Sequence, residues 1–250
     1  MRIASIILLP IFALTLPAQT KKPEPPPVKI PFAESRQAVV VTVPLTSSIQ
    51  GTARLFERKS VRSKWKQKGD SFPIVIGRNG LAWDIDSAPE SAAEFKKEGD
   101  GRSPAGMMPL TSTFGWTEAA GDLTHTKLTE FTECIDDANS TFYNRIANRM
   151  HVGNFDWKSS EKMLAVGPEY ELGVFVAYNS YPVRRGDGSC IFLHVWKDAS
   201  TGTSGCTAME KADLERIIAW LDSDKNPYLI QLTEADHRAY QQKWNLPKLK

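Results

Sequence analysis

Short runs of β-branched and aromatic residues are the feature of this sequence that most limits its fold. Such runs predict strands over residues 38–43, 53–57, 72–76, 173–178, 190–196 and 228–232. The turns between them are rich in glycine, asparagine, aspartate and serine, as at 77–80 and 186–189. Short strands joined by such turns predict a mainly β fold.

Helical periodicity is clear only near the C-terminus. Leu214, Ile217, Ile218 and Leu221 recur at helical spacing and predict a helix over residues 210–221. A second short helix is expected over 234–244. No repeat with a period of about 20 to 50 residues is present. We therefore expect one mainly β domain with a few packed helices.

The N-terminal segment has the pattern of an export signal. A positive charge at Arg2 precedes an apolar run over residues 4–16, and small residues follow, so residues 1–18 are predicted to be a signal peptide. Residues 19–36 are a proline-rich linker, and 37–250 form the domain. We expect the protein in the periplasm or cell envelope, with a membrane tether if the signal is not cleaved.

Charge and cysteine spacing exclude several classes of function. The chain has 31 Lys and Arg against 29 Asp and Glu. No basic block is interleaved with aromatic residues, so we expect no nucleic-acid partner. No clustered cysteine and histidine spacing predicts a metal site, and we expect no cofactor. We also expect a monomer.

Three cysteines in an exported chain leave one thiol without a disulfide partner. Cys134 and Cys190 are then the candidate pair, with Cys206 free. The alternative is that all three are reduced and buried as small apolar side chains. Both arrangements remain open from the sequence.

A histidine and a cysteine lie close together in the predicted topology. His194 is on the strand 190–196, and Cys206 follows twelve positions later in a turn marked by Gly205. A thiol attacks as its thiolate, so a nearby imidazole that takes the proton makes the pair a candidate nucleophile and base. The small polar loop before Cys206 predicts that it lies at the rim of the sheet. A core histidine and a buried cysteine are the structural alternative.

These segments resemble the catalytic domain of the L,D-transpeptidases (YkuD type). That signature is a histidine, a gap, and then Ser/Thr-His-Gly-Cys, matched here by His194, Thr203, Gly205 and Cys206. Residues 99–110 are similar to the family's Gly-Asp-Gly-Arg-Thr-Pro-Ala-Gly segment and the apolar pair after it. The resemblance runs from about Pro73 to Leu232 and implies a mixed β-sandwich or barrel.

Two positions depart from the family pattern. Ser204 replaces the histidine usual before Gly-Cys, which leaves His194 as the base candidate in the motif. Thr207-Ala208 stands where many members have an apolar residue and an arginine. Arg184 and Arg185, just before the histidine strand, are candidates to supply the missing cation, although exposed turn arginines are commonly solvated.

The resemblance implies an exported peptidoglycan L,D-transpeptidase. Cys206 attacks the third-residue carbonyl of a stem tetrapeptide, a thioester forms, D-alanine leaves, and an acceptor amine takes the acyl group in a 3→3 cross-link. With another acceptor or bond, the same residues would make an L,D-carboxypeptidase or an amidase. Two other classes of function stay open. One is a non-catalytic peptidoglycan-binding module, and the other is a redox protein with a Cys190–Cys206 bridge.

The physical roles follow from the residue types. The backbone N–H groups of Gly205 and Cys206 would stabilise the oxyanion, and His194 would accept the thiol proton and pass it to the leaving amine. A helix that begins directly after Cys206, with Thr207 at its cap, would lower the thiol pKa; the alternative start is Glu210. The candidate substrate-binding residues are Thr203, Ser204, Thr207, Arg184 and Arg185.

Overall fold

The computed structural model describes residues 31–118 and 121–249. The predicted signal peptide, 1–18, lies outside the described residues, and so does most of the predicted linker. Within the described part, no helix is both long enough and apolar enough to cross a membrane.

Thirteen strands lie in the described part of the chain. They are β1 Gln37–Val43, β2 Gln50–Glu57, β3 Lys66–Val75, β4 Leu81–Trp83, β5 Ser103–Gly115, β6 Thr124–Lys127, β7 Thr132–Cys134, β8 Ile146–Asn148, β9 Glu161–Lys162, β10 Leu172–Val176, β11 Phe192–Val195, β12 Thr207–Met209 and β13 Tyr228–Thr233. The α-helices are α1 Arg149–Val152, α2 Lys211–Trp220 and α3 Glu234–Tyr240, and the 3₁₀ helices are η1 Phe32–Glu34, η2 Met163–Val166, η3 Pro168–Tyr170 and η4 Ser223–Lys225.

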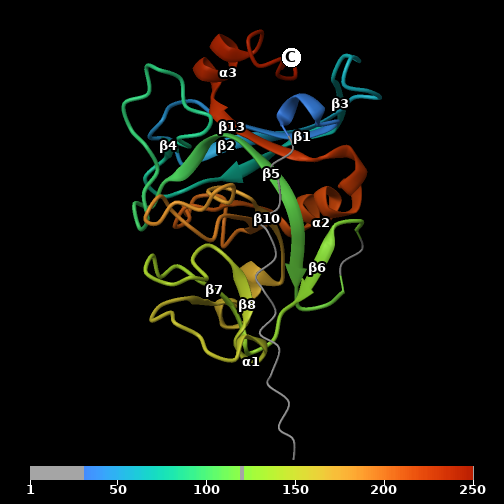
Figure 1. The fold of residues 1–250 in the computed structure, drawn as a ribbon. Helices are drawn as coiled ribbons and strands as arrows, with labels where there is room; N and C mark the ends of the chain where they lie inside the picture. The colour runs from blue at the N-terminus through green and yellow to red at the C-terminus, as the bar shows by residue number, and fades with distance from the viewer. Residues whose placement is uncertain (1–30, 119–120, 250) are drawn as a thin grey trace, which may run out of the picture.

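The large sheet curves into a barrel. Its strand order is β10-β11-β12-β3-β2-β1-β13-β5-β4, and an additional pairing of β10 with β5 closes the ring. Figure 1 shows β5 running from this barrel toward the lower part of the molecule. The apolar stripe of α2, Leu214, Ile217 and Ile218, packs in the main core cluster with side chains of β1 and β3. The predicted mainly β, barrel-like fold is confirmed.

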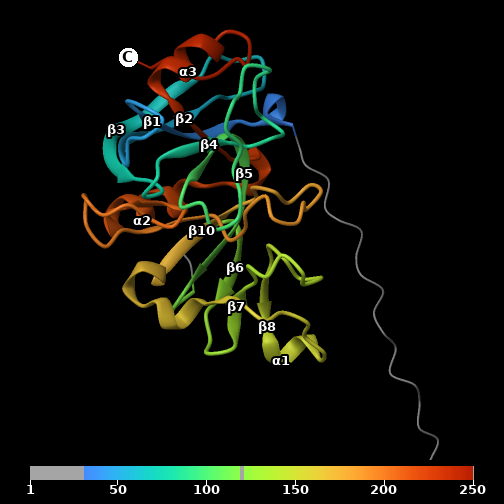
Figure 2. The same ribbon diagram turned by 90° about the vertical axis from the view of Figure 1, so that its left-hand side faces the viewer.

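A separate three-stranded sheet has the order β8-β7-β9. In Figures 1 and 2 this small sheet lies at one end of the molecule and α3 at the other. A disulfide between Cys134, on β7, and Cys190, just before β11, links the small sheet to the barrel, with an S–S distance of 2.02 Å. The candidate pairing is therefore confirmed, and Cys206 is free.

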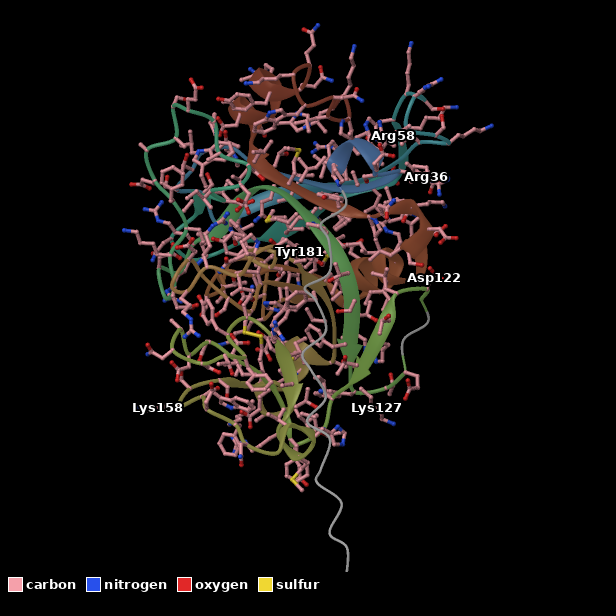
Figure 3. The ribbon with its side chains drawn as sticks, viewed as in Figure 1. Arg36, Arg58, Asp122, Lys127, Lys158 and Tyr181 are labelled. Carbon is pink, nitrogen blue, oxygen red and sulfur yellow. A yellow bond between two sulfur atoms is a disulfide. The ribbon has the colours of Figure 1, made fainter. Side chains whose placement is uncertain are left out.

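Packing begins before the predicted domain start at Gln37. The ring of Phe32 stacks on Trp65, with centroids 5.9 Å apart. Arg58 holds this segment by donating to the carbonyls of Ala33 and Ser35, at 2.6 and 2.7 Å. Figure 3 shows Arg58 near η1, where Arg36 is also labelled. Residues 32–36 are thus part of the folded domain rather than of an extended linker.

The predicted strands all exist, with shifted ends, but the structure adds strands that the sequence did not predict, β4 to β9 and β12. β5 is the longest strand and was not predicted, because Pro104, Gly106 and Pro109 interrupt its apolar run. Residues 207–209 form a strand, so α2 begins at Lys211, with Glu210 as its N-cap residue.

Candidate active site

Parallel pairing of β11 with β12 brings His194 and Cys206 together. His194 lies opposite Ala208 in this ladder, and Cys206 directly precedes β12. Both side chains line one cavity of about 380 Å³. The cavity is lined by Glu161, Val166, Glu169, Tyr170, His194, Trp196, Lys197, Thr201, Gly202, Thr203, Ser204, Cys206 and Ala208.

Two hydroxyl groups hold the turn that carries the cysteine. Thr203 Oγ1 accepts from the N–H of Gly205 at 3.1 Å and donates to the carbonyl of Cys206 at 2.6 Å. Ser103 Oγ, at the start of β5, faces the carbonyls of Gly205 and Cys206 at 2.7 and 3.1 Å. The N–H of Gly77 donates to the same Ser103 oxygen at 2.8 Å, so the turn is fixed from the barrel.

The backbone conformation at position 205 requires a glycine. Its φ is +152°, and a Cβ there would lie 3.0 Å from the carbonyl oxygen of Arg102. The Gly205 N–H is one of the two oxyanion donors expected from the sequence. In the structure it is already occupied, because it donates to Thr203 within the turn. The N–H of Cys206 is the other.

The Cys206 thiol is almost fully enclosed, with 6% of the residue exposed. The N–H of Phe192 donates to Sγ at 3.3 Å, and Sγ lies 3.4 Å from the carbonyl oxygen of Cys190. Burial and the negative charge of Glu161 raise the pKa of the thiol to about 12. The Phe192 N–H, Tyr170 and Lys96 lower the pKa, but their effect is smaller. The resting thiol therefore holds its proton at neutral pH.

His194 is buried beside the thiol. Its Nδ1 lies 2.7 Å from the carbonyl oxygen of Val195, and since a carbonyl only accepts, Nδ1 carries the hydrogen. Burial lowers the pKa of the imidazole, opposed by the Val195 carbonyl and by Glu169. No hydrogen bond joins this ring to the Cys206 thiol in the described part of the chain. Both residues lie in the walls of one cavity.

Tyr170 lines the same cavity as both members of the pair. Its ring meets that of His194 edge to face, with centroids 5.3 Å apart. Its hydroxyl donates to Oε2 of Glu161 at 2.7 Å. Burial raises the pKa of Glu161 to about 7, helped by the charges of Asp136 and Glu98.

Neither Tyr170 nor Glu161 was predicted as a site residue. They come from η3 and β9, two short elements with no periodic pattern, and only the tertiary fold brings them to the thiol.

The predicted substrate-binding residues separate into two groups. Thr203 and Ser204 line the cavity, as expected. Thr207 does not, because its side chain is fully buried and its hydroxyl donates to Gln231 at 2.6 Å. Arg184 pairs with Asp86 at 2.6 Å, and Arg185 donates to the carbonyl of Ala138 at 2.9 Å; neither lines the cavity.

Other cations lie at this end of the barrel. Lys197 lines the cavity, and Nη1 of the exposed Arg78 donates to the hydroxyl of Ser204 at 3.0 Å. Of the two helix starts considered, the structure has the one at Glu210: β12 intervenes between Cys206 and α2, so no helix N-terminus adjoins the thiol. Within the ranges described, no group of three or more His, Cys, Asp or Glu side chains is placed to hold a metal ion.

The fold and the site together define a β-barrel protein with a cysteine and a histidine in the wall of one cavity. The family model of the YkuD domain, the L,D-transpeptidase catalytic domain, matches residues 52–230, more than half of the chain. The chain therefore belongs to this family. No curated protein and no solved structure matches it at a significant level.

Proposed function

We propose that the protein is an exported peptidoglycan L,D-transpeptidase with Cys206 as its nucleophile. The observation that carries this proposal is the placement of Cys206 and His194 in one cavity of a YkuD domain. Stem peptides of peptidoglycan are the proposed substrates, and the periplasm or cell envelope is the proposed location. The N-terminal sequence supports export.

The proposed reaction has two halves. In the first, the Cys206 thiolate attacks the carbonyl of the third stem residue, and the bond to the terminal D-alanine breaks as the thioester forms. The N–H of Cys206 is the proposed donor to the oxyanion. His194 accepts the thiol proton as the thiolate forms and then gives it to the leaving amine. In the second half, the side-chain amine of a neighbouring stem attacks the thioester, and the thiol is released.

The cavity also offers groups that suit a peptide substrate. The hydroxyls of Thr203 and Ser204 can hydrogen-bond its backbone, and Lys197 and Arg78 carry the positive charge that carboxylates of the stem require. These two cations replace Arg184 and Arg185 in the proposal, since those side chains have other partners.

Acylation by a carbapenem, which acylates such cysteines in this family, is the first test. Intact mass analysis should show one adduct on the wild-type protein and none on Cys206→Ala. A folded wild-type protein that takes up no carbapenem would count against a nucleophilic Cys206 and favour a binding module.

Analysis of muropeptides from cell-wall sacculi, after incubation with the purified protein, is the second test. A 3→3 dimer is the expected product. A shortened stem without dimers would assign an L,D-carboxypeptidase instead, and release of an anchored protein would assign an amidase. In each case Cys206→Ala is the matched control.

A further inference from the structure

The turn between β2 and β3 concentrates positive charge on one part of the surface. Residues 58–68 contain six Lys or Arg and no Asp or Glu. Five of these side chains are exposed and are called the basic hairpin below: Lys59, Arg62, Lys64, Lys66 and Lys68. Figure 3 shows nitrogen-tipped side chains projecting from this turn, close to the label of Arg58. Such a cluster produces a local positive potential although the whole chain is nearly neutral.

The charge of the basic hairpin is not compensated within the protein. In the part of the chain that the structure describes, none of its five side chains has an ion pair or a side-chain hydrogen bond. Glu57 lies opposite Lys66 in the ladder, but its carboxylate is bonded to Trp220 and Lys225 instead. Five neighbouring cations are therefore free to meet an anionic partner.

The turn that presents these cations has a defined structure. The N–H of Ser63 donates to the carbonyl of Ser60 at 2.9 Å, and Nη1 of Arg58 donates to the carbonyl of Val61 at 2.9 Å. The Arg58 guanidinium also lies over the Trp65 ring, 4.4 Å from its centroid. Val61 is 38% exposed, so one apolar side chain stands among the cations.

The N-terminal segment enters the domain beside the basic hairpin. Phe32 of η1 stacks on Trp65, and Figure 1 shows η1 next to the turn between β2 and β3. Only residues 19–30 separate the predicted signal peptide from the described chain, and twelve residues reach at most about 45 Å. The basic hairpin is thus on the side of the domain from which the chain leads to its apolar N-terminal run.

Protection of an open sheet edge explains only part of this charge. Lys66 and Lys68 lie where β3 pairs with β2, whereas β12 pairs with a later part of β3. Lysines on such an edge prevent pairing with strands of other molecules. Lys59, Arg62 and Lys64 precede β3 and lie in the turn, where edge protection does not require them.

We propose that the basic hairpin docks the protein onto a bilayer surface that contains anionic lipids. Lipid phosphates are the anions that it would meet, and ammonium groups bind them as point charges without a fixed geometry. Each Lys or Arg near such a surface strengthens binding about fivefold, so five of them amount to about 10³-fold. Val61 adds apolar contact at the boundary between headgroups and acyl chains.

A bilayer fits the position of the basic hairpin better than an anionic polymer does. A polymer could be bound by cations on any face, whereas docking to a bilayer requires them on the face from which the chain leads to its apolar N-terminal run. That run, residues 4–16, is also the membrane-directed part of the predicted signal peptide. The inference rests on the proposed function only for the location in the cell envelope.

Vesicle binding of the purified full chain tests this proposal. Its affinity for vesicles of phosphatidylcholine with phosphatidylglycerol is divided by its affinity for phosphatidylcholine alone, which cancels the contribution of the apolar run. This ratio should be about 10³ for the wild type at low ionic strength. It should fall about 10²-fold in the triple variant Lys64→Gln, Lys66→Gln and Lys68→Gln. At about 1 M salt, where the Debye length is about 3 Å, this difference should vanish.

A second hairpin variant, Lys59→Gln with Arg62→Gln, changes the turn and leaves β3 intact. Its ratio should fall about 30-fold. Near-ultraviolet circular dichroism establishes folding, and if one hairpin variant does not fold, the other decides.

The matched control is the triple variant Lys97→Gln, Lys127→Gln and Lys243→Gln. It removes the same charge from three exposed positions outside the basic hairpin, on separate parts of the chain. Its ratio should stay within about twofold of the wild type, because charges more than a Debye length from the lipid are screened. An equal fall in this control would show that net charge, rather than the basic hairpin, directs binding, and the proposal would fail.

A wild-type ratio near one would overturn the proposal, and so would folded hairpin variants with the wild-type ratio. Hairpin variants that lose binding to lipid-free sacculi but not to vesicles would assign an anionic wall polymer instead. The vesicles contain no peptidoglycan. Selective vesicle binding without 3→3 dimers would therefore support the docking surface while contradicting the transpeptidase assignment, and dimers without selective binding would do the reverse.

Discussion

At the scale of single residues, Gly205 sets the position of the nucleophile. Its φ of +152° is sparsely populated by residues with a side chain, and occupying it costs about 1–3 kcal/mol. An added Cβ would also press on the Arg102 carbonyl, so the turn must move and carry Cys206 with it. We expect Gly205→Ala to slow carbapenem acylation about 10²-fold, the effect of displacing a reacting group by about 1 Å.

Gly99 supplies the control for this prediction. Its φ is +71°, but a Cβ there would meet nothing within 4 Å. Gly99→Ala should therefore lose about 1–2 kcal/mol of unfolding free energy from backbone strain and acylate at the wild-type rate. Equal loss of rate in both variants would show that strain alone, rather than the position of the thiol, limits the reaction.

Part of the site could be predicted from single residues. The spacing of His194 and Cys206, with Gly205 between them, indicated the reactive pair, because strand, loop and turn chemistry are local. Ser103 and Tyr170 could not be assigned in the same way. Their places beside the cysteine turn depend on how β5 and η3 fold against it, and that information is not local.

At the scale of elements, the sequence predicted the strands that have a continuous run of β-branched and aromatic residues. It missed strands such as β5 and β12, whose residues depart from that pattern. β5 contains Pro109, which lies opposite Tyr228 in the ladder with β13 and accepts a hydrogen bond from the N–H of Ala177 through its carbonyl. Proline has no N–H to donate, so such a strand does not follow the usual pattern. The sequence left residues 207–209 open between a helix start and a loop before Glu210, because Thr207 to Glu210 also fits a capping sequence.

The small sheet is held by one buried carboxylate. Glu133 is 2% exposed and lies 2.6 Å from both Arg149 and Lys162, and it accepts from the Trp157 indole at 2.7 Å. Burial alone would raise its pKa, but the hydrogen bonds, that from Lys162 foremost, outweigh burial and hold the pKa at about 2. One side chain thus joins β7, α1 and β9.

Glu133→Gln should lower the free energy of unfolding by about 2 kcal/mol at pH 7, since charge-assisted hydrogen bonds are lost. The folded pKa lies below the ordinary value of 4.5, so the ionised carboxylate stabilises the fold above pH 4.5 and loses this effect as pH falls toward 2. Urea unfolding at pH 7 and pH 3 measures the difference between wild type and variant, which should be smaller at pH 3.

Glu130→Gln is the matched control. Glu130 is exposed, and it precedes Cys134 by four positions in the segment that leads into β7. It should leave the unfolding free energy unchanged at both values of pH. A pH-independent loss in Glu133→Gln would instead assign the effect to packing rather than to charge.

At the scale of the whole molecule, a disulfide cross-links the small sheet to the barrel. The Cys134–Cys190 disulfide closes a segment of 56 residues that includes Glu161 and Tyr170. A loop of this length removes about 4 kcal/mol of chain entropy from the unfolded state. The bond also connects the carboxylate on β9 to the backbone beside the Cys206 thiol, so it contributes to both stability and the geometry of the site.

The double variant Cys134→Ala with Cys190→Ala should therefore show two separate losses. Its unfolding free energy should fall by about 4 kcal/mol. Its carbapenem acylation should also slow under conditions where the protein is folded, because the small sheet can then move relative to β11. The single variant Glu133→Gln weakens the small sheet without cutting this link, and should acylate faster than the double variant. If the double variant acylates at the wild-type rate while it is less stable, the disulfide serves the fold alone, and packing of Tyr170 against Phe114 and Phe192 is enough to align the site.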